Sequence, residues 1–353
     1  DAWPFVRTTG YGAAVQLAAQ SLFNLDFTAE NASSITAALR AFCHGKSSAQ
    51  IHAELYAHAN IAWSVNDMFW LQPGDASRFS GAAYLPFVSF APRFEQPGTH
   101  HYIGATAESV TAFSQAANVS IHSLAELERA LDDYATRLVA TRRVVAFKTA
   151  VAYGRRLGFD RTDAAVAARL FDQMLRGTPD QSLALSDYLF HRLVERARTF
   201  NLPLQIHTGY LAGTWQDLRH GDPHTLVPVF QHYRDVRFDL FHAGWPWTSF
   251  MGALGKAFPN VWLDLCWAWA MNPLQAERAL DEWLAAVPSN KIFLFGADIQ
   301  SPFAVIGYAL QARHGLASVL QRKITRGEYD TTTAQFVARR LLHENARAFF
   351  TMH

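Results

Sequence analysis

Three short apolar segments of this sequence each end in a residue that can bind a metal or move a proton. LPLQIH ends at His207, RFDLFH ends at His242, and KIFLFGAD ends at Asp298. The carboxyl ends of parallel strands lie at one edge of a sheet, so side chains at those ends can meet there. Neutral imidazole nitrogens and carboxylate oxygens both bind zinc and similar cations. The pattern therefore favours an enzyme whose metal is held by His207, His242 and Asp298.

The surroundings of these residues suggest their roles. A glycine follows each histidine two residues later, in QIHTG and FHAGWP, and lets the backbone turn sharply over the sheet edge. A lone histidine is more often an ordinary hydrogen-bonded residue, but two in matched positions together with Asp298 favour a site. Asp298 could be a metal ligand, a general base towards water, or both, and its alternative role is to cap the helix near Ser301-Pro302. We expect Asp298 and His242 to act in catalysis.

A lysine interrupts the apolar run VVAFKTA at position 148. Lys148 could bind a substrate carboxylate, form a Schiff base, or be carbamylated to bridge two metals. Alternatively it reaches solvent or pairs with Asp264, which ends VWLD and is a weaker candidate for a catalytic carboxylate. Tyr153, Arg155 and Arg156 follow on one loop, and such a cluster of cations suits an anion. We expect Lys148, Arg155 and Tyr153 to bind the substrate.

Aromatic residues crowd the segments that follow His242 and Asp264. They are Trp245, Trp247, Trp267 and Trp269. These rings could wall a pocket for a flat or apolar ligand, or they could be ordinary packing between loops. We expect Trp245 and Trp267 to line the substrate site, with Arg93, after FVSFAP, as a further anion-binding residue.

The elements that must position these residues alternate between apolar strands and helical segments, which is typical of parallel α/β proteins. The expected strands are Ile61–Asp67, Tyr84–Phe90, Val144–Ala150, Leu202–His207, Arg237–His242, Val261–Cys266 and Ile292–Asp298. The expected helices are Ile35–Phe42, Ala49–Ala59, Thr162–Arg176, Ser182–Phe200 and Thr331–Phe350.

This order of elements predicts an α/β fold of the (β/α)8 TIM-like barrel class. Residues 61–353 would form the barrel, and residues 1–60 would be a loop and helical segment packed on it. Such a barrel has eight parallel strands, so we expect the first strand either to precede Asp1 or to be missing from an open fold. An open doubly wound sheet is the alternative, but no glycine-rich phosphate-binding loop follows any expected strand.

Charge and composition indicate which class of molecule the protein binds. The 353 residues carry a formal net charge of +1, with 50% hydrophobic and 17% charged residues, and no block of like charges. A nucleic-acid or membrane-surface partner is therefore not expected, and a small-molecule substrate is. Two cysteines are too few for a disulfide framework, and no apolar run reaches the roughly 18 residues that span a bilayer. We expect a cytoplasmic protein that could form a homo-oligomer.

The order of Lys148, His207, His242 and Asp298 at successive strand ends resembles the amidohydrolase superfamily. The segments FKTAVAYGRRLGF, LPLQIHTGY, FHAGWPW, NVWLDL, KIFLFGAD and ENARAFF look like its amidohydrolase-2 branch, which includes the amidohydrolase-like domain of FluG proteins and is distantly similar to uronate isomerases. The resemblance runs from about residue 143 to the end.

The resemblance implies a distorted barrel with a divalent metal, usually zinc. The family holds it with a His-x-His pair on the first strand, a histidine matching His207 and an aspartate matching Asp298, while the residue matching His242 orients water or substrate or holds a second metal. This sequence contains no His-x-His. The pair either lies before Asp1 or has been lost. The implied function is hydrolysis of an amide or related carbon–nitrogen bond in a small carboxylate-bearing molecule. The alternatives are a decarboxylase, a uronate-isomerase-like enzyme and an inactive ligand-binding barrel.

Overall fold

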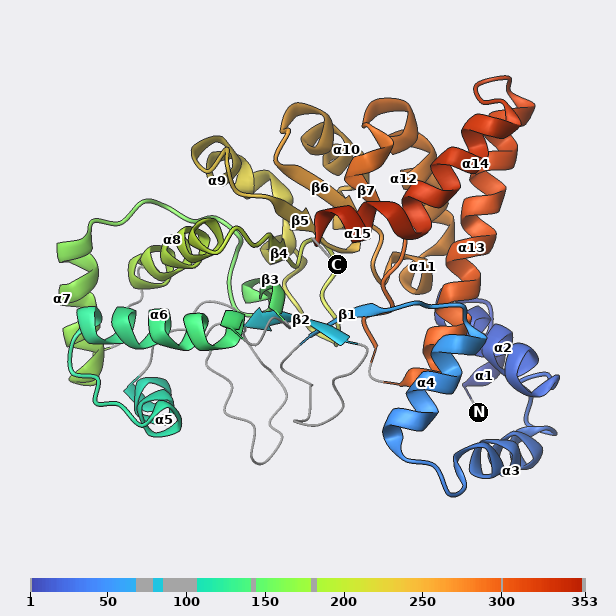
Figure 1. Cartoon of the computed structure of the whole chain (residues 1–353), viewed down its shortest axis with the longest axis horizontal. Helices are drawn as coiled ribbons and strands as arrows, with labels where there is room; N and C mark the ends of the chain where they lie inside the picture. The colour runs from blue at the N-terminus through green and yellow to red at the C-terminus, as the bar shows by residue number, and fades with distance from the viewer. Residues whose placement is uncertain are drawn as a thin grey trace. The chain divides into compact units, whose positions relative to one another are not determined.

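The computed structural model describes residues 2–67, 79–84, 107–140, 144–178, 183–299 and 301–350 (Figure 1). These residues form two compact units. One contains the chain up to Ser64 together with Leu263–Phe349, and the other contains the described residues between Val65 and Trp262.

Seven strands lie in the described part of the chain. They are β1 (Ser64–Asp67), β2 (Phe79–Tyr84), β3 (Val144–Thr149), β4 (Leu204–Ile206), β5 (Phe238–Leu240), β6 (Val261–Asp264) and β7 (Ile292–Phe293). Their order in the sheet is their order in the sequence, and β2–β3, β3–β4, β4–β5 and β6–β7 pair in parallel. The expected α/β class with sequential parallel strands is confirmed.

Two strands differ from the expectation. The observed strand β2 shares only Tyr84 with the strand expected at Tyr84–Phe90, and residues 85–90 lie outside the described part of the chain. The segment FSGAAY was missed because its small residues lack the β-branched run that marks a buried strand. The last strand covers only Ile292–Phe293, so Asp298 follows it at some distance instead of ending it.

The register of β3, β4 and β5 places chemically similar residues side by side. Phe147, Leu204 and Phe238 form one level and are fully buried. The next residues along each strand, Lys148, Gln205 and Asp239, are also partners in the register. Because side chains alternate between the two faces of a strand, these polar residues share the opposite face from the apolar level.

Helices of the unit that contains β3, β4 and β5 are α5 (Ala107–Ala117), α6 (Leu124–Ala140), α7 (Ala164–Leu175), α8 (Ala184–Thr199), α9 (Val227–His232) and α10 (Thr248–Ala257). The two helices expected here are confirmed as α7 and α8. Asp163 begins α7, because its carboxylate accepts the backbone N–H of Ala165 at 2.8 Å. The chain leaves α8 through Asn201, whose positive φ of 51° ends the helix.

The other unit contains α1 (Trp3–Val6), α2 (Gly10–Phe23), α3 (Ala32–Cys43), α4 (Ser48–His58), α11 (Ala268–Met271), α12 (Pro273–Ala286), α13 (Pro302–Thr325), α14 (Thr331–Arg339) and α15 (Asn345–Phe349). The helices expected at Ile35–Phe42 and Ala49–Ala59 are thus confirmed as α3 and α4. No described helix is both long enough and apolar enough to cross a membrane.

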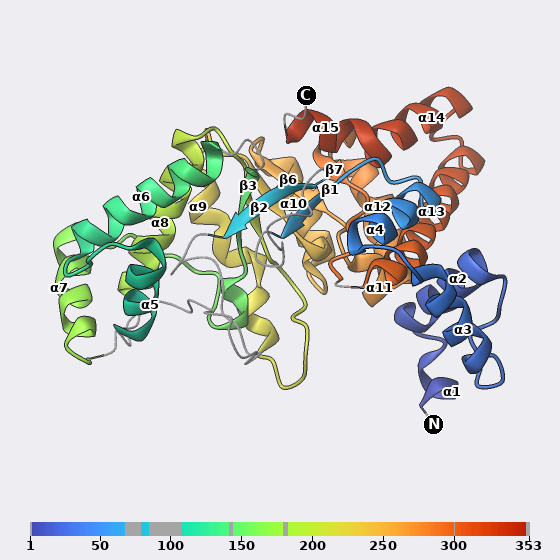
Figure 2. The same ribbon diagram turned by 60° about the horizontal axis from the view of Figure 1, so that its bottom comes forward.

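Helix α13 is the centre of this unit, with α2 and α4 packed along it (Figures 1 and 2). A Cβ added at Gly307 would lie 1.9 Å from the carbonyl oxygen of Ala14, so the two backbones touch where no side chain fits. The Gln311 amide donates to the carbonyl oxygen of Gly10 at 2.8 Å. The amino-terminal helices are therefore part of this unit's core.

The closing helix expected at Thr331–Phe350 is present in three parts. A π-helical turn at Arg340–Glu344 joins α14 to α15. The Asn345 amide then donates to the carbonyl oxygens of Ser289 at 2.6 Å and Ile292 at 2.8 Å. This side chain ties the end of the chain to the start of β7.

Candidate functional site

The structure brings His207 and His242 together. Both are buried, with exposed fractions of 3% and 0%, and they follow the neighbouring strands β4 and β5. Nε2 of His242 lies 3.0 Å from Nδ1 of His207, and Nε2 of His207 lies 2.9 Å from the carbonyl oxygen of Tyr210. A carbonyl oxygen can only accept, so Nε2 of His207 carries the hydrogen and its Nδ1 accepts the N–H of His242.

The backbone explains why these rings meet. Gly209 and Gly244 have positive φ angles of 77° and 56°, and a Cβ at Gly209 would lie 2.5 Å from the carbonyl carbon of Gly244. The loops after β4 and β5 can approach this closely only because Gly209 has no side chain. The expectation that these glycines allow a sharp turn beside each histidine is confirmed.

Strained backbone marks the same loops. Among the described non-glycine residues other than asparagine, six have positive φ, and His242 at 65° and Ala243 at 55° are consecutive. Trp267 at 63° and Asp298 at 48° follow β6 and β7 in the other unit. Such conformations cost about 1–3 kcal/mol each and tend to gather at functional sites. Four of the six lie at or beside residues that the sequence singled out.

The two imidazoles could share a cation if the hydrogen of His242 moved from Nε2 to Nδ1, because a ring nitrogen that binds a metal carries no hydrogen. Metal–nitrogen bonds of about 2.0–2.1 Å place two nitrogens on one tetrahedral ion roughly 3.4 Å apart, and nearer 3.0 Å at a right angle. The observed 3.0 Å between His242 Nε2 and His207 Nδ1 suits this second geometry. Within the described ranges, no group of three His, Cys, Asp or Glu side chains is placed to hold an ion.

Asp298 belongs to the other unit. Its side chain is exposed, contrary to the expectation of a buried carboxylate inside a strand. Its negative charge acts on Tyr308, whose pKa is raised to about 12, mainly by burial and then by this carboxylate. The loop that leads to Asp298 is held by the N–H of Trp267, which donates to the carbonyl oxygen of Gly296 at 2.8 Å.

Lys148 lies among polar residues that the sequence analysis missed. Its ammonium nitrogen lies 3.0 Å from the centre of the Phe241 ring, and its side chain is only 6% exposed. Gln205 donates through Nε2 to Oδ2 of Asp239 at 2.9 Å, and Asp239 is fully buried. Burial raises the pKa of Asp239 to about 7, while the Gln205 hydrogen bond and the charge of Lys148 oppose that rise.

The sequence also suggested Asp264 as an ion-pair partner of Lys148. Asp264 lies in the other unit, where its carboxylate accepts the backbone N–H of Cys266 at 2.7 Å. The sequence does contain a signal that could have identified Gln205 and Asp239 as site residues. Gln205 and Asp239 each stand inside an apolar strand just before a histidine, where an unpaired polar side chain is costly.

Tyr153 and Arg155 differ in what they contact. The Tyr153 ring stands edge-on to the His207 ring, 4.8 Å between centres, and its hydroxyl accepts the N–H of Ala212 at 3.1 Å. The Arg155 guanidinium forms a buried ion pair with Asp187, 2.6 Å between Nη2 and Oδ1, and donates to the carbonyl oxygen of Gly158. Arg155 thereby fastens the loop after β3 to α8.

The tryptophans that were candidates for lining the substrate site also differ in what they contact. Trp245 is half-buried and packs against Tyr210, with 5.3 Å between ring centres. Trp267 is 7% exposed, and the buried Trp269 donates through Nε1 to the carbonyl oxygen of Leu294 at 2.7 Å. Trp269 thus packs between loops, which was the alternative interpretation of these rings. Arg93 lies outside the described residues.

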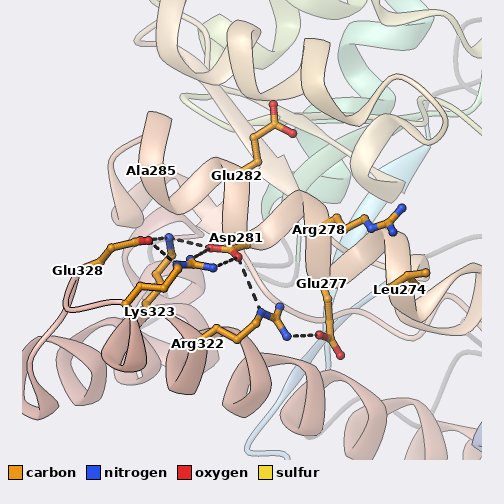
Figure 3. Close-up of a pocket in the computed structure, with 10 residues that line it drawn as sticks. Leu274, Glu277, Arg278, Asp281, Glu282, Ala285, Arg322, Lys323 and Glu328 are labelled. Atoms are coloured by element: carbon orange, nitrogen blue, oxygen red, sulfur yellow. Dashed lines mark hydrogen bonds and ion pairs between the residues drawn. The ribbon is translucent and has the colours of Figure 1, made fainter.

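A groove of about 520 Å³ beside α12 and α13 contains none of the predicted site residues (Figure 3). Asp281 accepts from Arg326 at 2.7 Å and pairs with Lys323 at 2.9 Å, while Glu277 accepts from Arg322 at 2.8 Å. The Arg326 hydrogen bond is the main reason that the pKa of Asp281 falls to about 2. These paired charges hold the two helices together.

Comparisons with known proteins agree with this fold. The chain is 27% identical to protein fluG of Emericella nidulans over 229 residues, which are 61% of this chain and 26% of fluG. It therefore spans about a quarter of that relative's length.

Two solved structures share the fold at low identity. A protein from Lactobacillus casei described as a metal-dependent hydrolase has a TM-score of 0.72 at 17% identity, over 99% of this chain and 86% of that one. Uronate isomerase from Thermotoga maritima has a TM-score of 0.77 at 12% identity, over 99% and 80%. The Amidohydro_2 family model, described as Amidohydrolase, matches residues 69–352, and the chain belongs to this family.

Proposed function

We propose that this protein is a metal-dependent hydrolase that cleaves an amide or related carbon–nitrogen bond in a small molecule bearing a carboxylate. The observation that carries the proposal is the buried His207–His242 pair, whose facing nitrogens are 3.0 Å apart at the ends of adjacent parallel strands. Family membership and the fold shared with a protein described as a metal-dependent hydrolase support it.

His207 and His242 would supply nitrogen ligands to a divalent cation, and we favour zinc because imidazole is among its usual ligands. When bound, the cation would supply Lewis acidity that polarises the scissile carbonyl. Tyr153 packs against the His207 ring and fixes its orientation. Asp298 is exposed, so its carboxylate can exchange protons with solvent and act as general base. Where His242 does not bind the cation, its N–H would donate to the developing oxyanion.

Lys148 would bind the substrate carboxylate. The face of the Phe241 ring holds its ammonium group, 3.0 Å from the ring centre. Arg155 would serve this site indirectly, since its guanidinium already pairs with Asp187 and fixes the loop after β3. Tyr153, Trp245 and Trp267 remain candidates for contacts with the rest of the substrate.

Metal analysis combined with a substrate panel tests the proposal. Purified protein loaded with zinc should hold stoichiometric metal, and His207→Ala and His242→Ala should each lose most of it. His122→Ala, at an exposed histidine far along the chain from either strand end, is the matched control and should keep it. N-acyl amino acids would report hydrolysis, uronates isomerisation and aromatic acids decarboxylation. Metal retention in both histidine variants would overturn the proposed site, and binding without turnover would favour a ligand-binding barrel.

A further inference from the structure

Asp239 and Lys148 are two buried residues of opposite charge in the sheet, on strands that are separated by β4. Lys148 pairs in register with Gln205, and Gln205 pairs with Asp239, so all three lie at one level on β3, β4 and β5. Side chains alternate between the two faces along each strand, so three residues that are partners in register lie on the same face of the sheet. Their exposed fractions are 6%, 3% and 0%.

One oxygen of the Asp239 carboxylate has no hydrogen-bond donor among the described residues around it. Oδ2 of Asp239 accepts from Gln205 at 2.9 Å, whereas Oδ1 is buried and no described group donates a hydrogen bond to it. The Lys148 ammonium lies over the Phe241 ring at 3.0 Å. Its positive charge acts on Asp239 through space and favours the ionised carboxylate.

We propose that binding of a substrate carboxylate at Lys148 is coupled to the uptake of one proton by Asp239. This inference rests on the role proposed above for Lys148. One buried ammonium can balance one carboxylate, so an incoming anion deprives Asp239 of its counter-charge and repels it. Asp239 then takes a proton from solvent and becomes neutral, with no other bond made or broken.

The surroundings allow this protonation near neutral pH. Burial raises the pKa of Asp239 to about 7 even with Lys148 charged, so its two forms differ little in free energy there. The other titratable groups on or beside the neighbouring strands are Arg237, which precedes β5, His207 and His242, which follow β4 and β5, and Asp264, which ends β6. Lys148 is the charged group that acts on Asp239.

Calorimetric titration with acetate and glutarate as probes tests the coupling. Measured in two buffers of different ionisation enthalpy, wild-type protein should take up close to one proton per bound anion above pH 7. Its Kd should rise about tenfold per pH unit in that range, because one proton is linked to one binding event. Asp239→Asn should bind without proton uptake and with a flat pH dependence. The matched control Asp281→Asn should behave like wild type.

An infrared titration of the free protein tests the same coupling without a ligand. The band of the protonated Asp239 carboxyl is identified by its loss in Asp239→Asn. Lys148→Met, or Lys148→Gln if the first variant does not fold, should move its midpoint upward by about one pH unit or more. An unmoved midpoint overturns the coupling. Probe binding that is lost in the Lys148 variant but shows no proton uptake in wild type would refute the coupling while preserving the role of Lys148. Undiminished binding in the Lys148 variant would instead remove that role.

Discussion

Replacing Asp239 by asparagine should make the protein more stable at alkaline pH and leave it nearly unchanged at acid pH. The wild-type carboxyl is fully buried, and its pKa rises from 3.8 to about 7 on folding. Below about pH 4 the Asp239 carboxyl is protonated in both the folded and the unfolded protein, so its ionisation does not lower the free energy of unfolding. As pH rises towards 7, only the unfolded chain releases the proton, so native stability falls. Above 7 the loss is complete.

The magnitude follows from the size of the shift. At 1.36 kcal/mol per pKa unit, a rise from 3.8 to about 7 corresponds to roughly 4 kcal/mol as an upper estimate. Asparagine cannot ionise, so Asp239→Asn should recover up to this amount at about pH 8. Any packing change that the amide introduces is the same at every pH. The pH dependence of the difference between variant and wild type therefore isolates the ionisation.

Urea unfolding between about pH 4.5 and 8.5, followed by tryptophan fluorescence and circular dichroism, measures this difference. Asp281→Asn is the control of opposite sign, because the pKa of Asp281 is lowered to about 2 by its contacts with Arg326 and Lys323. That variant should lose roughly 2 kcal/mol at most, and the loss should stay nearly constant across the measured range, because it vanishes only as pH falls from about 4 towards 2. A stability difference for Asp239→Asn that does not change with pH would refute the reasoning.

Further predictions concern the site and the fold. Asp298→Asn should abolish turnover with an unchanged circular dichroism spectrum, because the amide cannot act as a base; unchanged turnover would remove Asp298 from the mechanism. Lys148→Ala should raise KM without changing metal content, whereas loss of metal on elemental analysis would show that a carbamylated lysine is a ligand. Gly307→Ala should lower the melting temperature by several degrees, since its Cβ would lie 1.9 Å from the Ala14 carbonyl oxygen, and Gly158→Ala, whose Cβ would lie 3.6 Å from the nearest atom of Arg156, is the comparison.

The strands could be predicted from the sequence because runs such as LPLQIH are apolar, short and bounded by turn residues. Six of the seven expected strands contain an observed one, and the pairing of His207 with His242 followed from their matched positions. Asp298 was placed in a strand because IFLFGA is apolar, but the chain leaves the sheet after Phe293. Apolarity alone does not show where backbone pairing stops.

The contacts made by polar residues could not be predicted in the same way. Arg155 looked like an anion-binding residue because of its position in sequence, and its buried partner Asp187 comes from a helix 32 residues later. Asp239 is not predicted as a site residue from the sequence, because a single carboxylate in a strand usually faces solvent. Only the register between β3, β4 and β5 shows that it shares a level with Lys148.

The left-handed conformation at Ala243 has a consequence for engineering. Its φ of 55°, directly after His242 at 65°, is one that glycine adopts without strain. Ala243→Gly should therefore remove about 1 kcal/mol of native strain, although the more flexible unfolded chain offsets part of that gain. The same change would also give the backbone beside His242 more freedom, so the His242 ring would be held less firmly against the His207 ring. A screen for heat-tolerant variants would then select this substitution while a screen for turnover would reject it, which makes position 243 a place where robustness and activity compete.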